Sequence, residues 1–155
     1  MMAGNTKLKL VPNKPKKAGL MRVKLVQAGP ARFMVMNDAG ATAIIDGPAD
    51  MGGENAGLRP METLLSALAG CSALDVILIL KKQRQDLKRL EVEVEGERAD
   101  AVPAVFTNIH LRFKGYGSID LVKLQKAVEL SMEKYCSVAK MLQPAVAITA
   151  EGILG

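Results

Sequence analysis

The sequence predicts a single α+β domain, and two features of its hydrophobic pattern carry that prediction. Several short stretches alternate between apolar and polar residues, as half-buried β-strands do, whereas residues 61–84 are apolar almost without interruption over helical length. With 155 residues, 49% of them hydrophobic, the chain is large enough to bury a core. We expect the order β-β-β-α-β-β-α-α-β in one domain over residues 19–155.

The first three strands are expected at residues 20–27, 32–36 and 42–46, with Met21, Val23 and Leu25 on one face. Between the last two, residues 37–40 (Asn-Asp-Ala-Gly) predict a hairpin turn, because these residue types tolerate a left-handed backbone. Residues 1–18 are rich in lysine and interrupted by proline, and the chain has a net charge of +5. We expect a basic flexible arm there and neither nucleic-acid nor membrane binding, since no groove-reading motif accompanies the charge.

Residues 61–84 predict the central helix of the domain. Pro60 suits the first helical turn, where no amide proton is needed. A helix without a polar face must be covered on every side, so we expect it at the domain centre or in a subunit interface. Asp75 interrupts its apolar stretch, which favours a buried helix over a bilayer span. The preceding glycine-rich loop, residues 47–59, lacks a phosphate-binding motif and is interpreted as a mobile rim over a pocket.

Two alternating stretches, residues 90–98 and 105–113, predict a second antiparallel pair of strands. The inward positions expected on the second of these strands are Val105, Thr107, Ile109, Leu111 and Phe113.

An amphipathic helix should follow, capped by Ser118 or Asp120. The apolar stripe expected on this helix consists of Leu121, Leu124, Val128, Ser131 and Tyr135. Ser137 should then cap a short helix over residues 138–142, stopped by Pro144, and residues 146–150 should form the last strand.

The chain contains two cysteines. Because its N-terminus lacks the apolar run of a signal peptide, we expect the reducing cytosol, where cysteines are free or redox-active. Cys71 lies within the apolar helix and suits either a small core residue or a reactive thiol. Cys136 lies at a junction between helices, where backbone amides favour a thiolate, and it too is either a packing or a reactive residue. The two meet if their helices cross.

Other chemistries are less well supported by the residues present. The single histidine, His110, falls on the polar face of its strand and is expected at the surface. A zinc site would have to recruit carboxylates, since no CxxC or HExxH spacing occurs. We therefore expect no metal and no cofactor. Aromatic residues make up only 3% of the chain, which argues against stacking on nucleic-acid bases.

Two segments resemble the OsmC/Ohr superfamily, and more narrowly its OsmC-like branch. Residues 60–75 (PMETLLSALAGCSALD) are similar to the central-helix signature, and residues 133–138 (EKYCSV) are similar to the second cysteine segment. Their cysteines are 65 positions apart, and the similarity extends over about residues 20–154. The resemblance implies an OsmC-like α+β fold with a buried central helix, assembled as an intertwined homodimer with its sites at the interface.

The resemblance also implies roles for individual residues. Cys71 corresponds to the peroxidatic cysteine and Cys136 to the resolving one, while Arg32 and Glu62 are assigned as the activating pair, with Arg59 as a substitute for Arg32. The family glutamate directly follows the motif proline. Here Glu62 lies one position later, rotated by about 100° on a helix, so it equally suits a partner for the helix dipole.

These roles predict a thiol-dependent reductase of organic or hydrogen peroxides. Cys71 becomes a sulfenic acid, Cys136 condenses with it to a disulfide, and an external dithiol restores both thiols. The expected partners are a second copy of the chain, a small hydroperoxide and the dithiol. The alternative is a non-catalytic OsmC-like dimer that binds a small apolar or thiol-bearing ligand.

Overall fold

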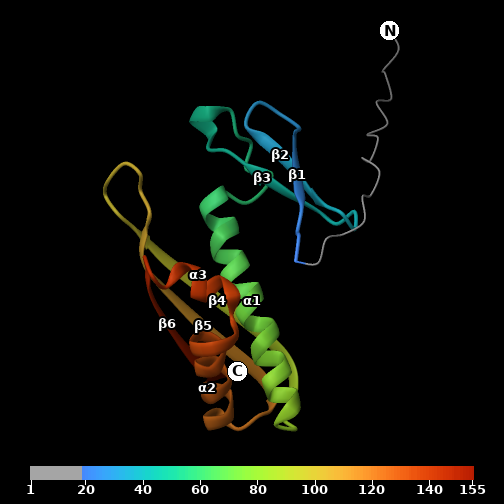
Figure 1. Cartoon of the computed structure of the whole chain (residues 1–155), viewed down its shortest axis with the longest axis vertical. Helices are drawn as coiled ribbons and strands as arrows, with labels where there is room; N and C mark the ends of the chain where they lie inside the picture. Colours follow the sequence, from blue (N-terminus) through green and yellow to red (C-terminus); the bar gives the residue numbers. More distant parts are fainter. Residues whose placement is uncertain (1–18) are drawn as a thin grey trace. The chain divides into compact units, whose positions relative to one another are not determined.

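The computed structural model describes residues 19–155, so the basic segment at residues 1–18 lies outside the described residues. The elements in chain order (Figure 1) are β1 (Val23–Gln27), β2 (Arg32–Asn37), β3 (Thr42–Asp46), a 3₁₀ turn (Ala49–Met51), α1 (Pro60–Lys82), β4 (Asp86–Arg98), β5 (Phe106–Ser118), α2 (Leu121–Leu130), a π-helical turn (Ser131–Tyr135), α3 (Ser137–Leu142) and β6 (Ala147–Leu154). The α+β class and the predicted order of strands and helices are confirmed.

The chain divides into two compact units, the first ending at Arg59 and the second running from Pro60 to Gly155. The expectation of one domain over residues 19–155 stays a prediction.

The first unit contains the antiparallel sheet β1-β2-β3. Its hairpin turn is confirmed at the expected residues. The Asn37 side-chain oxygen accepts hydrogen bonds from the backbone N–H groups of Ala39 (2.9 Å) and Ala41 (3.0 Å), and Gly40 has a φ of 85°. A short polar side chain and a glycine thus close the turn that the sequence pattern indicated.

This sheet has little core of its own. Among the described residues of the first unit, Asp46 is the one buried residue. Val23 and Leu25, on the face expected to point inward, are 68% and 50% exposed. A three-stranded sheet needs a covered apolar face to be stable, so this face requires a partner surface.

Asp46 organises the glycine-rich loop at residues 47–59. Its carboxylate accepts hydrogen bonds from the backbone N–H groups of Glu54 (2.9 Å) and Ala56 (3.0 Å). The bonds from Ala56 and Glu54 hold the pKa of Asp46 below its ordinary value. At Gly53 a side chain would collide with the carbonyl of Gly47. The loop is therefore anchored to its own sheet.

The second unit contains the sheet β4-β5-β6, with α1 and α2 on one face (Figure 1). β4 and β5 pair antiparallel, as predicted, while β6 pairs parallel to β5. A parallel neighbour needs a crossover connection, and here α2, the π-helical turn and α3 supply it.

The prediction of which β5 side chains point inward is wrong at the start of the strand. Ile109, Leu111 and Phe113 point inward as expected, but Thr107 is exposed, Val105 is exposed and Phe106 is buried instead. The register between β4 and β5 shifts at Glu97 and Arg98, which pair with Asn108 and Phe106. The extra residue in β5 reverses the alternation of side chains.

α1 buries one side only within the chain. Leu68, Ser72, Val76 and Leu80 are buried, and they follow one another at the four-residue spacing of a single helix face. α1 ends where Arg84 takes a positive φ of 56°, and Gln85 N–H donates to the carbonyl of Leu80. This is the hydrogen-bond pattern of a Schellman cap formed without glycine.

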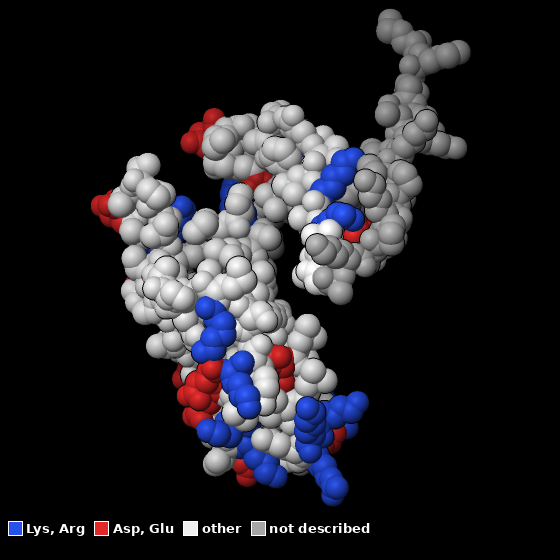
Figure 2. Space-filling model, viewed as in Figure 1, with Lys and Arg blue, Asp and Glu red and all other residues white. Residues whose placement is uncertain are grey.

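The remaining side of α1 is apolar and exposed in the single chain, with Leu74 65% and Leu78 56% exposed. Figure 2 shows few charged side chains along the middle of α1 and many at the end of the unit where α1 ends. By length and composition alone α1 is long and apolar enough to cross a bilayer, a test that core helices also pass. The prediction that α1 is covered on every side is therefore not fulfilled within one chain.

Asp120 rather than Ser118 caps α2, because its carboxylate accepts the N–H of Lys123 at 3.0 Å. The predicted stripe is partly wrong, since Leu121 and Tyr135 are exposed. The buried residues on α2 and the π-helical turn are Leu124, Ala127, Val128, Ser131 and Met132. The π-helical turn contains more residues per turn than an α-helix, so it rotates Tyr135 away from the expected stripe.

Candidate functional site

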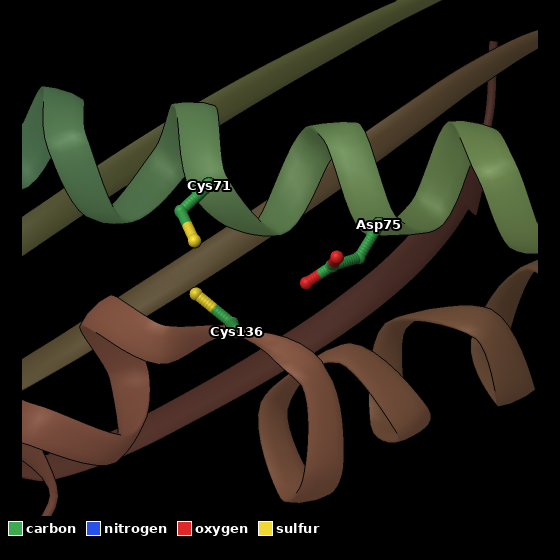
Figure 3. A group of neighbouring side chains, drawn as sticks. All are labelled: Cys71, Asp75 and Cys136. Carbon is green, nitrogen blue, oxygen red and sulfur yellow. The ribbon is translucent and has the colours of Figure 1, made fainter. Parts of the chain in front are cut away.

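The second unit brings both cysteines together with one carboxylate. The sulfur atoms of Cys71 and Cys136 and a carboxylate oxygen of Asp75 all lie within 4.8 Å of one another. Figure 3 shows Cys71 and Asp75 projecting from the same side of α1 toward Cys136, which lies between the π-helical turn and α3. Residues four apart on a helix share one face, so α1 alone fixes the pairing of Cys71 with Asp75.

Cys136 occupies the N-cap of α3. Its sulfur accepts the backbone N–H of Ala139 at 3.4 Å, and its own N–H donates to the carbonyl of Ser131 at 2.8 Å. The prediction that Ser137 caps this helix is wrong, because Ser137 is the first residue inside α3 and is exposed. The π-helical turn before it places the thiol, instead of the hydroxyl, over the free amides.

Burial dominates the acidity of Cys136. It raises the pKa of this thiol to about 11, the hydrogen bond from Ala139 opposes the rise, and the neighbouring Cys71 adds to it. The expected stabilisation of a thiolate by the helix end is therefore present but outweighed. At neutral pH Cys136 is a protonated thiol. Cys71 is half-buried and thus more accessible than the fully buried Cys136.

Asp75 is held by a hydrogen bond between elements. The hydroxyl of Ser131 donates to the Asp75 carboxylate at 3.0 Å, and the same hydroxyl lies 3.4 Å from the carbonyl of Ser72. Ser131 and Ser72 are buried. The sequence pattern alone assigns no role to Asp75 or Ser131, although each has a recognisable signal. Asp75 is the charge within an apolar helix, and Ser131 is a polar residue on an apolar stripe.

Glu62 lies in the first turn of α1, nine residues before Cys71. Nine residues make two and a half helical turns, so the two side chains leave α1 on opposite sides. This orientation argues against direct contact between Glu62 and Cys71 of the same chain. It fits better with Glu62 as a partner for the positive end of the α1 helix dipole. The assignment of Glu62 to the activating pair stays a prediction.

Arg32 and Arg59 belong to the first unit, where both have partners. Arg32 forms an ion pair with Glu54 (2.7 Å) and donates to the carbonyl of Ala28 (3.2 Å). Arg59 donates to the carbonyl of Asp46 (3.2 Å) and to the side-chain oxygen of Asn55 (2.7 Å). Their assignment as activating cations also stays a prediction.

His110 lies on the polar face of β5, as predicted. Its ring pairs with the Thr149 hydroxyl (2.7 Å) and with Glu151 (3.5 Å). Arg112 and His110 hold the pKa of Glu151 below its ordinary value. These partners all belong to the sheet, and the cysteines lie among the helices.

Known proteins are similar to this chain in sequence and in fold. The family model described as OsmC-like protein matches residues 52–151. Protein YhfA of Escherichia coli (strain K12) is 43% identical over 129 residues, covering 83% of this chain and 92% of that protein. The crystal structure of a hypothetical protein from Aquifex aeolicus VF5 is 33% identical with a TM-score of 0.74, covering 88% of this chain and 98% of that one.

A further solved structure, the organic hydroperoxide resistance protein OhrB of Bacillus subtilis, is similar in fold. It has a TM-score of 0.61 at 20% identity and covers 86% of this chain and 98% of its own. The family model alone spans well over half of the chain, and the identity to YhfA extends over most of both proteins. This chain therefore belongs to the OsmC-like family.

Proposed function

We propose that this protein is a thiol-dependent peroxidase that reduces organic hydroperoxides, and hydrogen peroxide less readily. The observation that carries the proposal is the proximity of two sulfur atoms whose residues lie far apart in sequence, within 4.8 Å of each other. A solved structure with a similar fold is named for organic hydroperoxide resistance. The apolar residues of α1 around Cys71 favour an organic substrate.

In the proposed cycle Cys71 attacks the peroxide ROOH and becomes a sulfenic acid as ROH leaves. The Cys136 thiol then condenses with the sulfenic acid, which forms the disulfide and releases water. An external dithiol reduces this disulfide and is itself oxidised to a disulfide. A reducing compartment such as the cytosol supplies dithiols of this class, and neither nucleic acid nor a membrane takes part.

The different surroundings of the two cysteines support their order of action. Cys71 is half-buried and open to a small substrate, whereas Cys136 is fully buried. The thiolate is the nucleophile in such reactions, and burial raises the pKa of Cys136 to about 11. Cys136 therefore does not compete for peroxide, and it acts only once a sulfenic acid is next to it.

The proposal assigns Arg32 as the cation that favours the Cys71 thiolate and Glu62 as its acidic partner, with Arg59 as the substitute for Arg32. These roles rest on the family motif. They require the guanidinium to serve Cys71 in addition to its bond with Glu54.

The proposal also includes a homodimer. The exposed apolar side of α1 and the uncovered face of the β1-β2-β3 sheet are both surfaces that a second copy would cover. Large exposed apolar patches on a folded chain are typical of subunit interfaces.

A second function, a non-catalytic dimer that binds a small apolar or thiol-bearing ligand, is favoured by one observation. The side chain that lies within 4.8 Å of both sulfurs is the Asp75 carboxylate, whereas reactive cysteines usually have a cation beside them.

Intact-mass measurement separates the two functions. Fully reduced protein treated with one equivalent of cumene hydroperoxide should lose about two daltons, the mass of two hydrogens, as the disulfide forms. Cys136→Ala should instead gain one oxygen atom, and Cys71→Ala should remain unchanged. A slow reaction that never reaches one equivalent in both the wild type and Cys136→Ala would refute the peroxidase and leave the binding function.

A further inference from the structure

The site brings three acidic groups together within the second unit. Cys71, Asp75 and Cys136 each lose a proton to become negatively charged, and their ligand atoms lie within 4.8 Å of one another (Figure 3). Neutral groups donate hydrogen bonds to these atoms, among them the Ser131 hydroxyl and the backbone N–H groups of Ala139 and Val138. A metal ion that replaces the thiol protons would be bound by all three groups as charged ligands.

We propose that Cys71, Asp75 and Cys136 form a zinc site, with two thiolate sulfurs and one carboxylate oxygen as ligands and water in the fourth position. This inference goes beyond the proposed peroxidase and does not depend on it. With two cysteines and one histidine in the sequence, zinc would have to recruit a carboxylate. Asp75 is that carboxylate, and only the crossing of α1 with the turn at Cys136 reveals it.

The geometry is close to what zinc requires. Zn–S bonds of about 2.3 Å and Zn–O bonds of about 2.0–2.2 Å place tetrahedral ligands roughly 3.5–3.8 Å apart. The three ligand atoms lie within 4.8 Å of one another, so a metal would have to draw them about 1 Å closer. Cys71 and Asp75 are four residues apart on α1, a spacing that places two ligands over one metal.

The ligand types and their supporting bonds select the metal. Two thiolates favour zinc over magnesium or calcium, which prefer oxygen ligands. Metal ligands are usually oriented by hydrogen bonds from a second layer of residues. Ser131 donates to the Asp75 carboxylate at 3.0 Å, and Ala139 donates to the Cys136 sulfur at 3.4 Å. Both ligands are therefore held in place before a metal arrives.

Metal binding and disulfide formation exclude each other at this site. Zn²⁺ displaces one proton from each thiol. A hydroperoxide ROOH can then take two electrons from the bound thiolates, and with two protons it gives ROH and water while the sulfurs join and Zn²⁺ leaves. Oxidation removes two of the three protein ligands, so the oxidised protein should not retain zinc.

The test uses the full-length, reduced, metal-free protein. Zinc titrated in competition with a chromophoric chelator should bind at one ion per chain, and cobalt in its place should give the sulfur-to-cobalt charge-transfer band of thiolate ligands. Cys71→Ser should lose that stoichiometric binding. Asp75→Asn keeps an acceptor for Ser131 but not the charge, and it should bind about tenfold or more weakly.

Glu133→Gln is the matched control, because Glu133 is an exposed carboxylate three residues from Cys136. It should bind zinc like the wild type, and circular dichroism should show all variants folded. Zinc lost to the chelator, a cobalt spectrum without the sulfur band, or unchanged affinity in Asp75→Asn would each overturn the site. Treating the metal-free protein with hydroperoxide tests the peroxidase separately, so either proposal can fail alone.

Discussion

Cys136 shows how one sulfur atom responds to opposing surroundings. Burial favours its neutral form, while the Ala139 N–H at the start of α3 favours the charged form. Burial prevails and raises the pKa to about 11 from an ordinary value of 9.0. A buried thiol costs little while it stays protonated, and it becomes costly when the solution favours its ionisation.

This raised pKa predicts a loss of stability at high pH. Between pH 9.0 and about 11 the unfolded chain releases the Cys136 proton while the folded chain keeps it. The folded state then binds more protons, so the free energy of unfolding falls as pH rises, by up to about 1.4 kcal/mol per pH unit from this group. Urea unfolding of the reduced protein across this range measures the fall.

Cys136→Ala provides the comparison, because lysine and tyrosine residues titrate in the same range in both proteins. The unfolding free energy of the variant should fall less steeply with pH than that of the wild type. Curves that remain parallel from neutral pH to pH 11 would contradict the raised pKa of this thiol.

The sequence predicted single residues only where a motif or a regular period marked them. The family motifs predict Cys71 and Cys136 as a pair, and the structure brings them together. In the sequence Asp75 stands out only as an interruption of the apolar helix. Its proximity to Cys136 depends on how α1 crosses the π-helical turn, and no local pattern encodes that crossing.

At the level of elements, periodicity predicted types and order well but failed where the backbone is irregular. The predicted inward face of β5 reverses at Thr107, because the register shift opposite Glu97 and Arg98 inserts a residue. The predicted stripe of α2 misplaces Tyr135, because the helix widens to a π-turn at Ser131. The spacing of apolar residues predicts the buried face correctly only where every residue adds the same rotation and rise to the helix or strand.

The hydrogen bond from Ser131 to Asp75 links that π-helical turn to α1. Ser131→Ala leaves a half-buried carboxylate without its recorded donor, so it should lower the free energy of unfolding by about 1–3 kcal/mol. Chemical denaturation at neutral pH measures the loss.

Ser137→Ala is the same substitution at an exposed position in the first turn of α3. It should change stability by less than about 0.5 kcal/mol. A large loss in Ser137→Ala would mean that Ser137, rather than Cys136, caps α3.

For the molecule as a whole, what the chain leaves uncovered matters as much as what it buries. The apolar pattern of α1 predicts coverage on every side, yet Leu74 and Leu78 are exposed. Val23 and Leu25 of the first sheet are exposed as well. An apolar pattern shows that a surface must be covered but not which molecule covers it. The proposed homodimer supplies the cover from a second copy.

The proposed dimer makes the exposed side of α1 sensitive to charge. Leu78→Lys introduces a cation on that side, which desolvation disfavours in an interface, so it should convert a two-chain particle to a single chain of 16.6 kDa. Val122→Lys makes the same change on α2, where Val122 is 76% exposed, and should leave the assembly intact. Light scattering after size-exclusion chromatography measures the masses. A wild-type protein with the mass of one chain, or an equal effect of both variants, would show that α1 does not form the interface.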